Sequence, residues 1–188
     1  CRQRLMPARR LYSRITGTGS GLPRRIVSNE ELARELATRG VETSDEWITT
    51  RTGVRERHMA GDGETLSDFC VAAGAAALEN AGVAAKDLDA VLVATVTPDQ
   101  PIPAVACLVQ HKLGATRAWG FDVSAACSGF TYALTVGAQF VESGAHQKVL
   151  VIGADVMTSI LDFQDRATCV LFGDGAGAVL LEPSSDDT

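Results

Sequence analysis

The sequence has too few positive charges for a protein that binds nucleic acid. Its 17 lysine and arginine residues are outnumbered by 23 aspartate and glutamate residues, and the formal net charge is −6. Binding along a phosphate backbone requires clustered lysine and arginine, so no nucleic-acid partner is expected. The arginine-rich segment CRQRLMPARR lacks an apolar run long enough for a secretory signal or a membrane-spanning helix. We therefore expect a cytoplasmic protein with no membrane partner.

Cysteine pairs at metal-binding spacing are also absent. The cysteines are odd in number, far apart and never spaced as C-x-x-C; they are Cys1, Cys70, Cys107, Cys127 and Cys169. This pattern favours reduced thiols and indicates neither a disulfide framework nor a metal site. Histidine is scarce, because only His58, His111 and His146 occur, and each is placed by the pattern in a loop, late on a helix or in a turn. No Cys–His pair is evident.

Strand and helix patterns do alternate from end to end, which is typical of a layered α/β fold. A chain of 188 residues, 46% of them hydrophobic, is large enough for one domain with a substantial core. Strands are expected at 14–19, 90–96, 119–124 and 149–153, and helices at 29–40, 66–81, 103–113 and 127–143. We expect an irregular stretch at 42–58, a helix buried on all sides at 127–143, and an edge hairpin at 168–183.

Local signals mark several of these boundaries. Ser28 with Glu31, and Thr65 with Asp68, have the spacing of capping boxes at helix starts. The stretch GTGSGLP superficially resembles a dinucleotide-binding loop, but no helix follows it, so that interpretation is rejected. In GDGAG, Asp174 is interpreted as a turn residue, and the glycines as positions of positive φ or close backbone approach.

Cys127 is the strongest candidate for chemistry. It lies in FDVSAACSGF, where a strand pattern gives way to a helix pattern. A thiol in the first turn of a helix meets free backbone amides and the positive end of the helix dipole, which make it a better nucleophile. The small residues around it leave room for a substrate carbonyl, and their amides offer an oxyanion site. The alternative is a cysteine that serves only in packing, which is the interpretation favoured for Cys70, Cys107 and Cys169.

The segment SDEWITTRTG offers a second candidate. Trp47 and Arg51 supply a flat ring and a guanidinium, which together can stack on a nucleotide base or contact phosphate. Without further evidence this is only a loop that contains a tryptophan.

Four motifs in this order resemble the first half of β-ketoacyl-acyl-carrier-protein synthase III, the initiating condensing enzyme of bacterial fatty-acid synthesis. They are ITGTGSGLP, TSDEWITTRTGVRERH, FDVSAACSGFTYAL and LDFQDRATCVLFGDGAGAV, spread from about Tyr12 to Glu182. The resemblance implies a thiolase-like fold, in which two similar βαβαβαββ halves form five α/β/α/β/α layers. It also implies an acyltransferase that is usually a homodimer and needs no cofactor beyond its coenzyme A thioester substrate.

The resemblance assigns roles to particular residues. Cys127 matches the nucleophile that takes the acyl group from acyl-coenzyme A before malonyl-acyl carrier protein enters, decarboxylates and attacks the thioester. Trp47 and Arg166 match the residues that sandwich the adenine of coenzyme A, and Thr43 and Arg51 match others in the coenzyme site. Ile102, in the loop DQPIPA, matches the residue that closes the partner's acyl pocket. Many relatives carry an aromatic residue at this position. Isoleucine is smaller, so we expect this protein to accept acyl primers longer than acetyl.

The family's catalytic histidine and asparagine, and most of its carrier-protein surface, belong to the second half. We therefore expect an N-terminal extension at 1–11, a half-domain at 12–183, and at 184–188 the start of a linker to a further half. A half alone should expose apolar surface and self-associate. Two alternatives stay open: a related enzyme that primes a polyketide, quinolone or other secondary pathway, and a non-catalytic protein that binds acyl-coenzyme A or pairs with a separate half.

Overall fold

A five-stranded mixed sheet forms the centre of the computed structural model, which describes residues 11–185. In spatial order the strands are β1 (Tyr12–Gly21), β7 (Asp174–Ser184), β6 (Val149–Val156), β4 (Ala90–Ala94) and β5 (Trp119–Val123). β4 runs parallel to both β5 and β6, whereas β7 runs antiparallel to both β1 and β6. β4 is buried along its whole length, as expected for a central strand covered on both faces.

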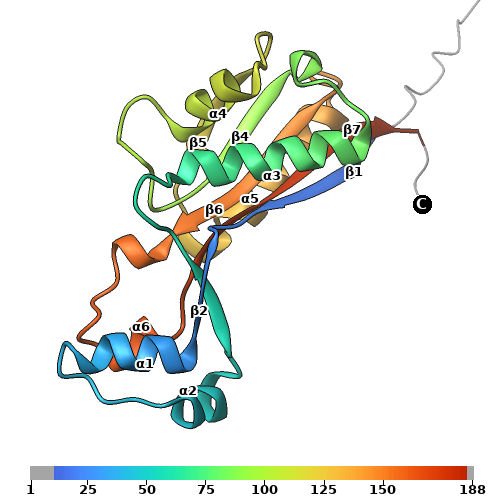
Figure 1. Ribbon diagram of the computed structural model, residues 1–188. Helices are drawn as coiled ribbons and strands as arrows, with labels where there is room; N and C mark the ends of the chain where they lie inside the picture. The colour runs from blue at the N-terminus through green and yellow to red at the C-terminus, as the bar shows by residue number, and fades with distance from the viewer. Residues whose placement is uncertain (1–10, 186–188) are drawn as a thin grey trace, which may run out of the picture.

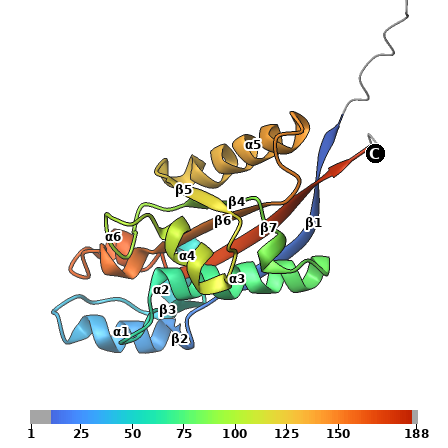
Figure 2. The ribbon, with the colours of Figure 1, turned by 90° about the horizontal axis from the view of Figure 1, so that it is seen from above.

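Helices cover both faces of this sheet and give three α/β/α layers (Figures 1 and 2). On one face, α3 (Leu66–Ala81) and α4 (Val105–Leu113) enclose the larger core with the sheet. On the other face, α5 (Gly129–Glu142) packs on the sheet through Ala133 and Val141. Short 3-10 turns lie at Ala85–Asp87 (η1), Ala126–Ser128 (η2) and Met157–Ser159 (η3). The layered α/β prediction is confirmed.

A small lobe extends from one end of the sheet (Figure 1). The two-stranded ribbon of β2 (Arg25–Ser28) and β3 (Glu56–Met59) carries α1 (Asn29–Ala37), α2 (Asp45–Thr52) and the one-turn helix α6 (Arg166–Cys169). Its separate core includes Val27, Leu32, Leu36, Ile48 and Cys169. The lobe therefore joins segments from both ends of the chain.

Most expected strands and helices are present, but the prediction of an irregular stretch at 42–58 is wrong. That stretch contains α2 and β3. Ser44 caps α2 by accepting a hydrogen bond from the Trp47 N–H, and Gly53 ends it at a φ of 74°. Both signals were in the sequence, but α2 lacks a strong apolar stripe because Ile48 is its only buried residue. Of the two predicted capping boxes, only the one at Thr65 and Asp68 closes from both sides.

Three further predictions fail. The predicted edge hairpin at 168–183 is instead the end of α6, a short loop and the single strand β7, which lies inside the sheet between β1 and β6. Asp174 is not a turn residue: it is buried, and it accepts hydrogen bonds from the Ala60 N–H and from the N–H and hydroxyl of Thr158. α5 is not buried on all sides, because no described residue covers its face at Thr131, Tyr132 and Thr135.

The predicted domain limits reach the ends of what the structure describes. The extension at 1–11 lies outside the described residues except for Leu11. β7 continues through Ser184, one residue past the predicted end of the half-domain, and 186–188 are outside. Within residues 11–185, no helix has the length and apolar character needed to cross a membrane.

The GTGSG motif lies in β1, where its glycines let the strand contact α3 directly. A Cβ atom on Gly17, Gly19 or Gly21 would lie 2.1 to 2.2 Å from a backbone carbonyl oxygen of α3. No side chain fits there without moving the helix. The motif is therefore a packing device, in agreement with the rejection of a phosphate loop.

We predict that Gly19→Ala lowers the free energy of unfolding by about 3 kcal/mol, because the new methyl group would overlap the Ala73 carbonyl oxygen. Gly177→Ala is the matched control, since a Cβ there meets nothing within 4 Å. Urea denaturation of both variants measures the difference. Equal stabilities for the two variants would contradict this account of β1 and α3.

Candidate active site

Cys127 lies in the tight connection between β5 and α5. It is exposed, belongs to the 3-10 turn η2 and stands two residues before the first residue of α5. The preceding residue, Ala126, has a φ of 45°, a left-handed conformation that a residue with a Cβ adopts only at an energetic cost. Strained backbone of this kind is concentrated at functional sites. No local pattern predicts this conformation, because alanine does not ordinarily mark a positive φ.

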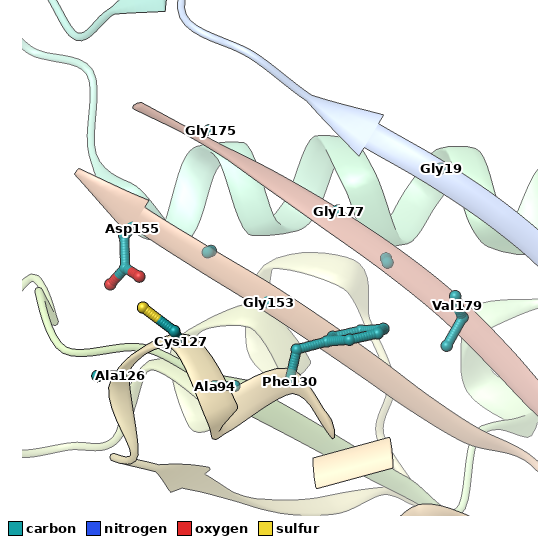
Figure 3. Close-up of a pocket in the computed structure, with 12 residues that line it drawn as sticks. Gly19, Ala94, Ala126, Cys127, Phe130, Gly153, Asp155, Gly175, Gly177 and Val179 are labelled. Atoms are coloured by element: carbon teal, nitrogen blue, oxygen red, sulfur yellow. The ribbon is translucent and has the colours of Figure 1, made fainter. Parts of the chain in front are cut away.

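A pocket of about 490 Å³ opens beside Cys127 (Figure 3). The Cys127 sulfur is directed toward the Asp155 carboxylate, and the Phe130 ring extends along the pocket toward Val179. Small residues form most of the remaining wall: Gly19, Ala94, Ala126, Gly153, Ala154, Gly175, Gly177 and Ala178. The pocket is therefore mostly apolar, with a thiol and a carboxylate at one end.

Asp155 fixes the backbone at this end of the pocket. Its Oδ1 atom accepts hydrogen bonds from the Thr95 hydroxyl at 3.1 Å, the Val96 N–H at 2.9 Å and the Thr97 hydroxyl at 3.1 Å. These bonds join the ends of β4 and β6. Sequence reasoning missed Asp155. The signal that could have revealed it is a carboxylate near the end of a buried strand.

No histidine lines this pocket in the described chain. His58 contacts the Pro23 carbonyl oxygen through Nδ1, and His146 accepts a hydrogen bond from the Trp119 indole N–H through Nε2. His111 is exposed on α4. All three histidines thus lie outside the lining of the Cys127 pocket.

The structure brings the predicted coenzyme-site residues together in the small lobe. The guanidinium carbon of Arg51 lies 4.5 Å, and that of Arg166 lies 4.4 Å, from the centroid of the Trp47 ring. We call these three side chains the clamp. Arg166 also donates to the Glu42 carbonyl oxygen at 2.9 Å, next to Thr43, whose buried hydroxyl has no hydrogen-bond partner in the described part of the chain. Residues far apart in the sequence thus form one cluster.

The clamp is closed in this conformation. Two flat groups that sandwich a third must stand about 7 Å apart, twice the usual contact distance between stacked atoms. The 4.4 Å between Arg166 and Trp47 is too short for that. A base can enter only if the Arg166 side chain moves away from the ring.

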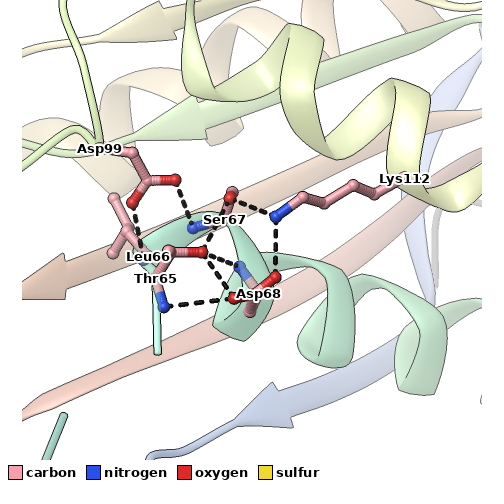
Figure 4. Close-up of polar contacts among 6 residues, drawn as sticks. All are labelled: Thr65, Leu66, Ser67, Asp68, Asp99 and Lys112. Carbon is pink, nitrogen blue, oxygen red and sulfur yellow. Dashed lines mark hydrogen bonds and ion pairs between the residues drawn. The ribbon is translucent and has the colours of Figure 1, made fainter. Parts of the chain in front are cut away.

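Ile102 is the most exposed large apolar side chain of the described chain, at 85%. Its loop is held at both ends by carboxylates that sequence reasoning missed. Asp99 accepts from the Leu66 and Ser67 N–H groups at the start of α3, as Figure 4 shows. Asp122 accepts from the Val105 and Ala106 N–H groups at the start of α4. Ile102 is therefore presented to the outside by an anchored loop.

Comparison with known proteins identifies relatives. The family model for 3-oxoacyl-[acyl-carrier-protein (ACP)] synthase III matches residues 121–188. A β-ketoacyl-[acyl-carrier-protein] synthase III of Xylella fastidiosa is 54% identical over 179 residues, covering 95% of this chain and 54% of that protein. One of Koribacter versatilis is 53% identical over 174 residues, covering 93% and 51%. The chain spans about half the length of these relatives.

Solved structures of related proteins also match this chain. The 3-oxoacyl-[acyl-carrier-protein] synthase III of Aquifex aeolicus matches with a TM-score of 0.86 at 46% identity, over 93% of this chain and 55% of that one. The priming β-ketosynthase of the R1128 polyketide pathway matches with a TM-score of 0.89 at 43% identity, over 98% and 54%. The fold and the pocket thus define a thiolase-like protein with a cysteine at its site. The chain belongs to the β-ketoacyl-acyl-carrier-protein synthase III family, of whose members it corresponds to one half.

We predict that alkylation separates the described thiols. At pH 8, iodoacetamide should modify exposed Cys127 first, because Cys70 and Cys169 are buried and burial raises the pKa of both thiols. Raised pKa values leave little thiolate at this pH. Peptide mapping by mass spectrometry gives the order of modification. Modification of Cys70 before Cys127 would contradict the placement of both residues.

Proposed function

We propose that the protein containing this chain condenses an acyl-coenzyme A primer with malonyl-acyl carrier protein, and so initiates fatty-acid synthesis. The Cys127 thiolate attacks the thioester carbonyl, and coenzyme A leaves as its thiol with the proton that Cys127 gave up. Malonyl-acyl carrier protein then loses carbon dioxide, and its carbanion attacks the acyl group on Cys127. The products are 3-oxoacyl-acyl carrier protein and the free cysteine.

One observation carries this proposal: an exposed cysteine, held by strained backbone near the start of α5, faces a mostly apolar pocket. Free backbone N–H groups at the start of a helix favour a thiolate and the oxyanion that its attack creates. An acyl chain fits an apolar pocket of this kind. The relatives named for this reaction support the assignment.

The clamp is the proposed coenzyme A site. A planar ring beside two guanidinium groups suits an adenine with nearby phosphates, because arginine both stacks on rings and binds phosphate. In this proposal the Arg166 side chain moves away from the Trp47 ring, and the adenine enters between the two. Thr43 and Arg51 then contact the coenzyme. The Thr43 hydroxyl, which is buried and has no partner among residues 11–185 in this conformation, would gain one from the coenzyme.

We further propose a homodimer in which Ile102 reaches the partner's acyl pocket. Within residues 11–185, β5 has a neighbouring strand on one side only, and Ile102 is almost fully exposed. An open strand edge and a projecting apolar side chain are both suited to pairing with a second copy. In this scheme, catalysis needs no cofactor beyond the coenzyme A thioester. A cytoplasmic location stays a prediction.

A second candidate function is the priming of a polyketide pathway. The similarity to the R1128 priming β-ketosynthase supports it as directly as other structures support fatty-acid synthesis. Both candidates use the same acyl-Cys127 step, and they differ in the primer and in the carrier protein. Primer selectivity therefore separates them.

We predict that acetyl-coenzyme A increases the protein's mass by one acetyl group, and that Cys127→Ala abolishes this increase. Intact mass spectrometry of the protein expressed from its gene measures it, with Cys107→Ala as the control because Cys107 lies outside the pocket. An acetyl group on the Cys127→Ala variant would refute the role of Cys127.

We also predict that Ile102→Phe reduces turnover of octanoyl-coenzyme A relative to acetyl-coenzyme A by about tenfold, since the larger ring would shorten the partner's acyl pocket. Turnover of acetyl-, butyryl- and octanoyl-coenzyme A by both proteins is the measurement. Strict acetyl preference in the unmodified protein would rule out the proposed tolerance of longer primers.

A further inference from the structure

A buried arginine in the small lobe has no role in the chemistry described so far. Arg57 lies on β3 within the motif RTGVRERH and is 6% exposed. No carboxylate lies within ion-pair distance of it among residues 11–185. Burial lowers the pKa of its guanidinium. An unpaired buried charge is costly, so its neighbours must compensate for it.

The compensation comes from three acceptors on three segments. Arg57 Nη1 donates to the Val27 carbonyl oxygen of β2 at 3.2 Å. Its Nη2 donates to the Asn29 side-chain oxygen of α1 at 2.7 Å and to the Val170 carbonyl oxygen at 3.3 Å. Val170 directly follows α6, which carries Arg166. The guanidinium therefore links the segment that carries Arg166 to the ribbon of β2 and β3.

Asn29 extends this connection to α2. Its side chain is fully buried, and its Nδ2 atom donates to Asp45 Oδ1 at 2.8 Å and to the Thr49 hydroxyl at 3.2 Å. Asp45 and Thr49 belong to α2, which carries Trp47 and Arg51. The same Nδ2 atom also donates to the Val54 carbonyl oxygen at 2.7 Å, just after α2. One continuous chain of hydrogen bonds thus joins α2 to α6 through Asn29 and Arg57.

We propose that Arg57 and Asn29 are positioning residues for the clamp, which set the spacing between Trp47 on α2 and Arg166 on α6. The inference rests on the proposed coenzyme A site and goes beyond it. Neither Arg57 nor Asn29 belongs to the clamp itself. Lysine cannot replace Arg57, because one ammonium lacks the planar fork that serves acceptors on separate segments at once.

Two thioesters distinguish positioning from general damage. Acetyl-coenzyme A uses the clamp, whereas S-acetyl-N-acetylcysteamine carries the same thioester without adenine or phosphates. The rate of Cys127 acylation with each is measured on the full protein by intact mass spectrometry. The variants are Arg57→Lys and Thr49→Val, which removes one hydroxyl with little change in volume. Thr50→Val is the control, because among the described residues the exposed Thr50 hydroxyl bonds only to the Glu46 carbonyl oxygen of its own helix.

We expect Arg57→Lys and Thr49→Val to shift saturation by acetyl-coenzyme A to about tenfold higher concentrations, with the limiting rate unchanged. Acylation by the short thioester should stay as in the unmodified protein, and Thr50→Val should affect neither substrate. Equal losses with both thioesters, or no loss with either, would overturn the inference.

Trp47→Ala separates failure of this inference from failure of the proposed function. If Trp47→Ala weakens use of acetyl-coenzyme A but Arg57→Lys and Thr49→Val do not, the positioning role is wrong and the coenzyme site stands. If Trp47→Ala has no selective effect, the coenzyme site is wrong, and the inference falls with it. If neither thioester acylates Cys127, the proposed reaction itself is wrong.

Discussion

The site depends on carboxylates that accept hydrogen bonds from the backbone where strands end and helices begin. Asp155 joins the ends of β4 and β6 beside the Cys127 pocket. Asp99 and Asp122 hold the loop of Ile102 to the starts of α3 and α4. Asp174 joins the end of β3 to η3. Each of these carboxylates satisfies at least one backbone N–H group that a loop or a helix start would otherwise leave unpaired. A pocket built from irregular segments thereby acquires a fixed shape.

Much of the fold follows from local patterns in the sequence, and much of the site does not. The apolar run at Ala90–Ala94 and the capping box at Thr65 act over a few residues, so the sequence alone predicts them. The interior position of β7 depends on pairing with β1, more than 150 residues earlier in the chain, and no local pattern reveals it. The exposed face of α5 has the same cause, because burial depends on what packs against a helix. Arg166 is assigned to the coenzyme site only through the family resemblance. Its proximity to Trp47 is visible only in the structure.

The two parts of the site use different physical means. At Cys127 the means is strained backbone, which holds an exposed thiol next to a mostly apolar pocket. In the small lobe the means are a tryptophan ring, guanidinium groups and a buried hydrogen-bond chain that joins segments from both ends of the sequence. In the proposed function, a thioester with a long polar carrier group would use both: one region for the reacting carbon and another for the carrier.

The most direct test of this account is a crystal structure of the protein after incubation with acetyl-coenzyme A. The account predicts an acetyl group on the Cys127 sulfur, and a bound coenzyme whose adenine lies between Trp47 and a displaced Arg166. An unmodified Cys127, with the coenzyme bound away from Trp47, would contradict it.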